Sequence, residues 1–228
     1  RVSRLGIVSS KPIMLPRSRQ FDFTLAVAVK TAWAIVLSHH VTSNDVVFAD
    51  ILTGRTVVQP SVADVVACCA RAVPCRVTCE PEWTAERLLK QIKQQQVDSM
   101  EHESLELQQI AQRFMGWSEE VDSDAPDMRV SMVNHTKAQK QVMSLGPTVY
   151  ERVAVDSSNS YASVDFAIES VEQEDGSLSV GMAFASDRIS EQLARTLSDR
   201  FQAVLVEIVE DPGCNVSDLH EMLSSTEE

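Results

Sequence analysis

The sequence lacks the local motifs by which many enzymes and membrane proteins are recognised. It has no Gly-x-Ser-x-Gly, no His-Glu-x-x-His and no glycine-rich phosphate loop. With only seven glycines in 228 residues, a nucleotide-binding loop would be hard to build. No apolar run reaches the roughly 20 residues that cross a bilayer. The longest run, residues 24–37, is shorter and contains Lys30. The residues alone therefore show no complete active site and indicate no membrane partner.

Positive charge is also scarce. The chain carries 20 Lys and Arg against 33 Asp and Glu, a net charge of -13. Nucleic-acid surfaces need clustered Lys and Arg, and anionic membranes attract basic segments, so both partners are disfavoured. An apolar fraction of 44% is ample for the core of one large domain or two small ones. Because the chain lacks an initial Met and a signal-peptide pattern, we interpret it as a piece of a larger protein.

Four of the five cysteines cluster without forming a Cys-x-x-Cys pair: Cys68, Cys69, Cys75 and Cys79. Residues 72–79 alternate like a strand, which would place Cys75 and Cys79 about 13 Å apart. That distance is too long for two ligands of one tetrahedral metal. We therefore predict no metal site, and we interpret these residues as reduced core cysteines of a cytoplasmic protein.

Alternating helical and strand patterns predict an α/β fold with helices packed on one sheet. Asp22 or Thr24 is expected to cap the first helix, and Thr84 the second. The first strand is apolar throughout, which is typical of a strand buried on both faces. The expected helices are 24–38, 83–96, 103–115 and 189–208, the expected strands are 45–51, 71–79 and 128–135, and the expected hairpin is 164–184 with Asp175-Gly176 in its turn. Residues 118–127 read as an acidic loop, and residues 224–228 as a frayed end.

Two histidine-containing pairs are candidates for chemistry. His39-His40 is followed by Asp45, as in a base with an orienting carboxylate, but the pair ends a buried helix, where cationic or polar side chains suit the helix dipole. We therefore assign it no catalytic role. Asn134-His135 ends an apolar strand and is the polar pair that we expect to line a cavity.

Four segments resemble, in order, successive motifs of nonribosomal peptide synthetase condensation domains, in part their fungal form. They are residues 32–55 (AWAIVLSHHVTSNDVVFADILTGR), 66–77 (VACCARAVPCRV), 88–117 and 130–139 (VSMVNHTKAQ). The hairpin and the closing helix also fit, so the resemblance runs from about residue 20 to residue 220. Gly54, Pro74 and Arg76 stand at motif positions of this family. The sequence departs from the family pattern at Ala49, Ala67, Arg71 and Thr136.

This resemblance implies a chloramphenicol-acetyltransferase-like sandwich, in which a mixed sheet carries helices. Residues 21–220 would form the C-terminal lobe of the domain, with residues 1–20 as a linker from a preceding lobe and residues 221–228 as a tail. The family's catalytic His-His-x-x-x-Asp-Gly motif lies in the N-terminal lobe, so no catalytic residue is expected in this chain. Arg55 matches the family Arg that reaches across the cleft to pair with the Asp of that motif. Its bidentate guanidinium suits such an ion pair.

The resemblance also implies a reaction and partners. A carrier-bound acceptor amine attacks a carrier-bound donor thioester, in a cleft to which Arg55, Asn134 and His135 would contribute. No cofactor is expected to bind directly, but the phosphopantetheine arms of partner carrier proteins would enter the cleft. The implied partners are the N-terminal lobe, upstream and downstream carrier proteins and an adjacent adenylation domain. A catalytically inactive docking lobe, half of an epimerisation domain and a terminal cyclising role all remain open.

Overall fold

The computed structural model describes residues 5–15, 23–54, 69–102, 105, 110, 113, 131–138, 142–145, 148–151 and 165–225. Within these residues, one mixed sheet has the strand order β1-β9-β8-β5-β3-β4, and β2 also pairs with β9. The central strands β3, β5 and β8 are mutually parallel, and the other pairs are antiparallel. The strands of this sheet are β1 (Leu5–Ser9), β2 (Ile13–Met14), β3 (Asp45–Leu52), β4 (Arg71–Thr78), β5 (Ser131–Lys137), β8 (Phe166–Glu172) and β9 (Ser177–Ala185).

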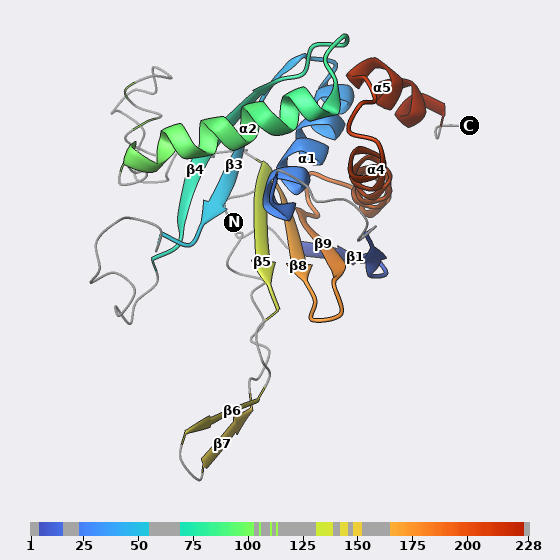
Figure 1. Cartoon of the computed structure of the whole chain (residues 1–228). Coiled ribbons are helices and arrows are strands. Elements are labelled where there is room, and N and C mark those ends of the chain that lie inside the picture. The colour runs from blue at the N-terminus through green and yellow to red at the C-terminus, as the bar shows by residue number, and fades with distance from the viewer. Residues whose placement is uncertain are drawn as a thin grey trace.

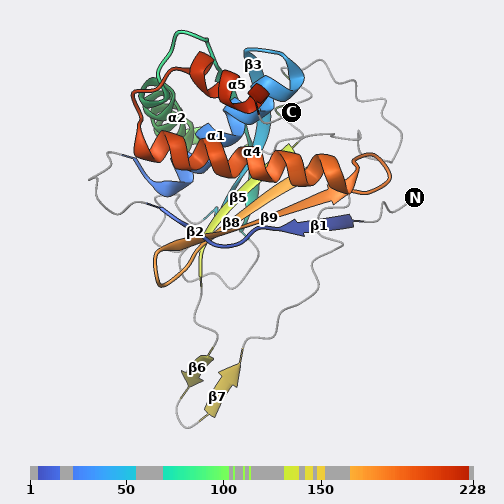
Figure 2. The ribbon, with the colours of Figure 1, turned by 90° about the vertical axis from the view of Figure 1, so that its right-hand side faces the viewer.

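The helices pack together on one face of this sheet, as the side view shows (Figure 2). Thr24 caps the first helix by accepting a hydrogen bond from the backbone N–H of Val27, and Thr84 caps the second in the same way. The prediction that Thr84 is a cap is therefore confirmed, and Thr24 rather than Asp22 caps the first helix. The helices are α1 (Leu25–Val41), α2 (Ala85–Ser99), α4 (Glu191–Glu210) and α5 (Val216–Ser225), with the 3-10 turn η1 (Met100–His102) after α2.

Alternation along the strands decides which side chains meet the helices. Val46 and Phe48 of β3 belong to the core beneath α1, and so do Phe166 and Ile168 of β8. Trp33 of α1 stacks on Phe166 with 5.4 Å between ring centroids, and its indole N–H donates to the Ser131 hydroxyl over 3.0 Å. The helix-facing side of the sheet is therefore closely packed.

The hairpin of β8 and β9 forms as its sequence predicts. Gly176 has a φ of 83°, which a turn residue without a side chain adopts readily. The Asp175 carboxylate accepts a hydrogen bond from the backbone N–H of Ser177 over 2.8 Å and fixes the same turn. A second hairpin, β6 (Val142–Leu145) and β7 (Thr148–Glu151), forms its own two-stranded sheet and lies apart from the main one (Figure 1).

Three expectations need correction. Residues 1–20 are not simply a linker, because β1 and β2 within them pair with β9 as part of the sheet. Residues 221–228 are not simply a tail, because α5 continues to Ser225 and buries Leu223. β3 is buried on both faces only in part, because on the face opposite the helices Val47 is 44% exposed whereas Ala49 is buried.

The expected helix 103–115 and the acidic loop 118–127 lie almost wholly outside the described residues. Among the helices that are described, none is long and apolar enough to span a membrane.

Candidate functional site

The predicted Gly54 lies two residues after the end of β3. Arg55, the next residue, lies outside the described residues. Gly54 has a φ of 64°, in the left-handed region. A Cβ at this position would lie 1.8 Å from the carbonyl oxygen of Cys69. The turn therefore needs glycine both for its backbone conformation and for the close approach of the chain that leads into β4.

Pro74 and Arg76 lie on β4, an edge strand of the sheet. Proline is tolerated on an edge because the ladder hydrogen bond that it cannot donate is not required there. The Arg76 guanidinium donates two hydrogen bonds to the Asp45 carboxylate, over 2.8 and 2.6 Å. This pair is exposed, and the guanidinium holds the pKa of the Asp45 carboxyl below its usual value. Arg76 thus joins β3 to β4 in this structure.

Asn134 and His135 do not line one cavity, because neighbours on a strand point to opposite faces. His135 shares the helix-facing side with Val133, and its Nδ1 lies 2.9 Å from the Ser170 hydroxyl. Burial lowers the pKa of the His135 imidazole, although Glu172 acts in the opposite direction. The expectation that the two residues act as a pair is therefore wrong, and only Asn134 lies on the face opposite the helices.

That opposite face carries a row of cross-strand neighbours that the sequence did not reveal. Asn134 pairs with Glu169 of β8, and Glu169 pairs with Gly181 of β9. We call these three residues the polar row. Ile51 of β3 and Ser9 of β1 continue it at either end.

Two properties of the polar row bear on binding: the partial burial of Glu169 and the surroundings of Gly181. Glu169 is partly buried, and desolvation raises the pKa of its carboxyl. At Gly181, an added Cβ would have no atom of the described residues within 4 Å. The alternation of the hairpin predicted which residues share a face, but not that Glu169 would have Asn134 as its neighbour on one strand and Gly181 on the other.

A second polar cluster lies beneath the sheet, among α1, α2 and β3. The Lys30 ammonium donates to the Asp50 carboxylate over 2.8 Å and to the Gln96 side-chain oxygen over 2.9 Å. The Lys30 and Asp50 side chains are only 4% and 11% exposed. This cluster ties β3, the strand that leads to Gly54, to both helices.

At the end of α1, His39 of the histidine pair contacts α5. The His39 Nε2 lies 3.1 Å from the Ser224 hydroxyl, and its ring meets His220 edge-on at 5.4 Å between centroids. Burial, with His39 nearby, lowers the pKa of His220. His40 is exposed. These contacts support the interpretation of His39 as a helix-end residue.

None of the cysteines that the structure describes belongs to a group of side chains that could bind a metal ion. Burial raises the pKa of both the Cys75 and Cys79 thiols to about 12. Within the described residues, no group of three or more His, Cys, Asp or Glu side chains is arranged to hold a metal ion.

Comparison with known proteins places this geometry in a family. The sequence profile described as "Condensation domain" matches residues 19–228. "Nonribosomal peptide synthetase 32" of Fusarium pseudograminearum is 89% identical over 223 residues, which are 98% of this chain and 2% of that protein. "Nonribosomal peptide synthetase vlms" of Lecanicillium sp is 57% identical over the same length, again 98% of this chain and 2% of that protein. The chain therefore spans only a small part of the curated relatives that it matches.

Solved structures show the same fold at low identity. The condensation domain of Monacolin K polyketide synthase MokA matches with a TM-score of 0.73 and 16% identity, over 94% of this chain and 48% of that one. A structure described as a CT mutant matches with a TM-score of 0.74 and 23% identity, over 95% of this chain and 48% of that one. These matches confirm the expected sandwich of helices on a mixed sheet, and the chain spans about half of each solved structure.

Proposed function

Because this chain belongs to the condensation domain family, we propose that it is the C-terminal lobe of a condensation domain in a fungal nonribosomal peptide synthetase. The observation that carries the proposal is the combination of a profile match to residues 19–228 with coverage of about half, 48%, of a solved condensation domain. A single lobe of a two-lobe domain would give this result. The named synthetases among its relatives come from fungi.

In this proposal the lobe supplies one wall of the cleft between the lobes. The face of the sheet opposite the helices would form that wall, and it carries Asn134. Arg55, which follows Gly54 at the end of β3, would pair with the Asp of the catalytic motif on the other lobe. The hairpin of β6 and β7, which lies apart from the main sheet, is suited to bridge toward that lobe (Figure 1).

The proposed reaction forms an amide. The acceptor amine attacks the carbonyl carbon of the donor thioester, the new C–N bond forms, and the C–S bond breaks to release the donor's phosphopantetheine thiol. A histidine of the N-terminal lobe would orient the amine or take up its proton. This lobe would hold the partner lobe and the substrates in position, an effect that lowers the barrier by fixing the reacting groups. Upstream and downstream carrier proteins and an adjacent adenylation domain are the proposed partners.

The test compares this chain alone with the two-lobe domain, meaning this chain joined to its own N-terminal lobe. Each is mixed with donor and acceptor carrier proteins loaded with aminoacyl groups, and amide formation is followed by mass spectrometry. Amide from the two-lobe domain and none from the single lobe would support the proposal.

Other outcomes identify the alternatives. Carrier binding without amide formation would indicate an inactive docking lobe. Inversion of the loaded residue without a new bond would indicate an epimerisation domain.

A further inference from the structure

We infer that the polar row of Asn134, Glu169 and Gly181 binds the hydrogen-bond-donating side chain of a carrier-bound aminoacyl group. This inference rests on the proposed function, since it takes the face of the sheet opposite the helices to be the cleft wall. It adds what that wall selects: a residue with a hydroxyl, amide or amine in its side chain rather than an apolar one.

The surroundings of Glu169 point to a polar ligand. The apolar residues near it on the same face of β8 and β9 include Ala167 and Ala183, which are almost fully buried, and Val171, which is partly buried. A partly buried carboxylate among such side chains is stabilised by hydrogen-bond donors, because leaving its oxygens unsatisfied is costly. A carboxylate accepts about four hydrogen bonds, so a ligand can be added to the partners that Glu169 already has.

The space for such a ligand lies beside Glu169. Gly181 is its direct cross-strand neighbour, and no atom of the described residues lies within 4 Å of where a Cβ would stand. Asn134 flanks Glu169 on the other side in β5 and adds an amide with both a donor and an acceptor. Directly paired side chains on neighbouring strands lie roughly 5 Å apart, so one small polar group is able to contact both.

The polar row also lies near the end of β3, beyond which Arg55 follows in the sequence. Ile51 of β3 adjoins Asn134 in the row, and Gly54 follows three residues later at the strand end. The side chain held by the polar row would therefore lie near the end of β3 from which Arg55 extends the chain.

The test measures binding, so that it does not depend on turnover. The probes are pantetheine amides of threonine and valine, which differ mainly by a hydroxyl in place of a methyl group. Each is used with a free α-amine, which imitates an acceptor, and with an acetylated α-amine, which imitates a donor. Dissociation constants are measured by calorimetry with the two-lobe domain.

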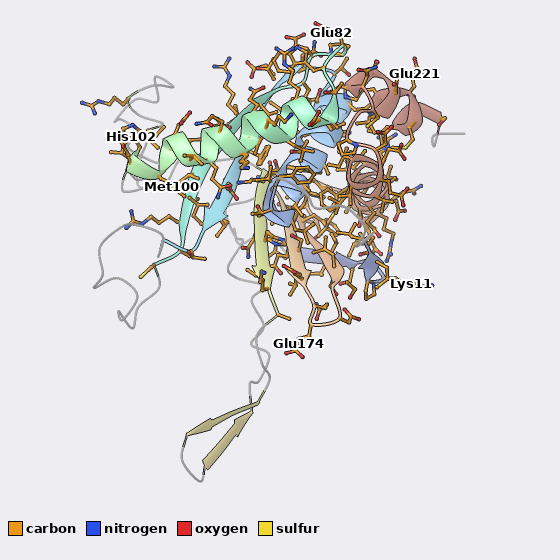
Figure 3. The ribbon with its side chains drawn as sticks, in the orientation of Figure 1. Lys11, Glu82, Met100, His102, Glu174 and Glu221 are labelled. Atoms are coloured by element: carbon orange, nitrogen blue, oxygen red, sulfur yellow. The ribbon has the colours of Figure 1, made fainter. Side chains whose placement is uncertain are left out.

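We expect a preference of roughly tenfold for threonine over valine in one of the two probe forms, as a hydrogen bond to a charged acceptor provides. The form that shows the preference identifies the acceptor or the donor as the ligand. In Glu169→Leu the preference should disappear. The matched control is Glu174→Leu, which removes a carboxylate at the exposed tip of the same hairpin and should leave the preference unchanged (Figure 3).

Gly181→Val provides a second, independent test in case Glu169→Leu does not fold. β-branched residues suit a strand, and no atom of the described residues lies within 4 Å of a Cβ at Gly181, so the fold should be retained. Threonine binding should weaken about tenfold because the new side chain fills the ligand's space.

No preference in the wild-type domain, or a preference that survives in both variants, would overturn the inference. If the domain forms no amide but shows the preference, the inference stands and the proposed reaction fails. If amide forms without any preference, the proposed reaction stands and the inference fails.

Discussion

The ammonium of Lys30 lies 2.8 Å from the carboxylate of Asp50, and both side chains are almost excluded from water. This ion pair joins α1 to β3 in the layer between the helices and the sheet. Buried charges are tolerated when they are paired, and removing one partner leaves the other uncompensated.

We therefore predict that Asp50→Ala destabilises the two-lobe domain by about 3–5 kcal/mol, measured by urea denaturation. Replacing both partners by apolar residues, as in Lys30→Met with Asp50→Leu, should restore most of that stability, since neither charge is then buried. The control is Lys90→Ala, which breaks the exposed pair with Glu86 and should cost under about 0.5 kcal/mol. Equal effects at the buried and exposed pairs would contradict this prediction.

Gly54→Ala should destabilise the domain by more than about 2 kcal/mol, because it combines a left-handed backbone with a Cβ placed against the Cys69 carbonyl. Gly181→Ala is the matched control. Its Cβ would have no atom of the described part of the chain within 4 Å, so stability should be unchanged or slightly increased. Thermal denaturation of both variants makes the comparison, and similar losses at the two positions would disprove it.

The stability of the domain should decrease between about pH 7 and pH 5, partly through His220. Because burial lowers the folded-state pKa of His220 below 6.5, the unfolded chain binds a proton in this range before the folded chain does. The stability from neutral His220 is complete above the unfolded pKa and is lost as the pH falls toward the folded one. His39 is the titratable neighbour that faces it and lowers its pKa further.

His220→Leu should therefore flatten the pH dependence of the melting temperature, whereas His102→Gln should not. His102 is exposed at the end of η1, the turn that follows α2 (Figure 3). An unchanged pH profile in His220→Leu would show that His220 does not carry this effect.

Cys75 and Cys79 should resist alkylation by iodoacetamide at pH 8 in the native protein. Burial raises both thiol pKa values to about 12, so almost no thiolate is present to react. Both should react after denaturation, as peptide mass mapping would show. Metal analysis of the same preparation should find no stoichiometric zinc, and one tightly held equivalent would refute our interpretation of these cysteines.

Arg55→Ala should affect the two-lobe domain but not this chain alone. In the single lobe, a guanidinium aimed at an absent wall would be hydrated and would contribute little. In the two-lobe domain, its loss would leave the partner Asp uncompensated, at a cost of about 3–5 kcal/mol if the pair is well buried, and would lower the rate of amide formation. Denaturation and amide formation are measured in both contexts.

Equal destabilisation in both contexts would show that Arg55 serves the fold of this lobe. Full activity of the two-lobe variant would show that Arg55 has no role in the cleft.

Much of the local structure follows from short-range patterns along the chain. A long apolar run predicted α1, the spacing of apolar residues predicted α2 and α4, and Asp175-Gly176 predicted the turn between β8 and β9. These features depend on contacts within a few residues, which the sequence displays directly. The ordered motifs also indicated the family, because each stands in a recognisable local context.

Which residues lie beside one another depends instead on how distant segments pack. Asn134 and His135 look like a pair in the sequence, yet the pleat of β5 sends them to opposite faces of the sheet. The short segment with Leu5 to Ser9 has no strong strand pattern, and it becomes a strand because β9 offers an edge for pairing. Glu169 and Gly181 gained significance only when the register of the sheet brought them beside Asn134. Such contacts join residues far apart in the chain, and their energies depend on burial and distance, which local sequence does not specify.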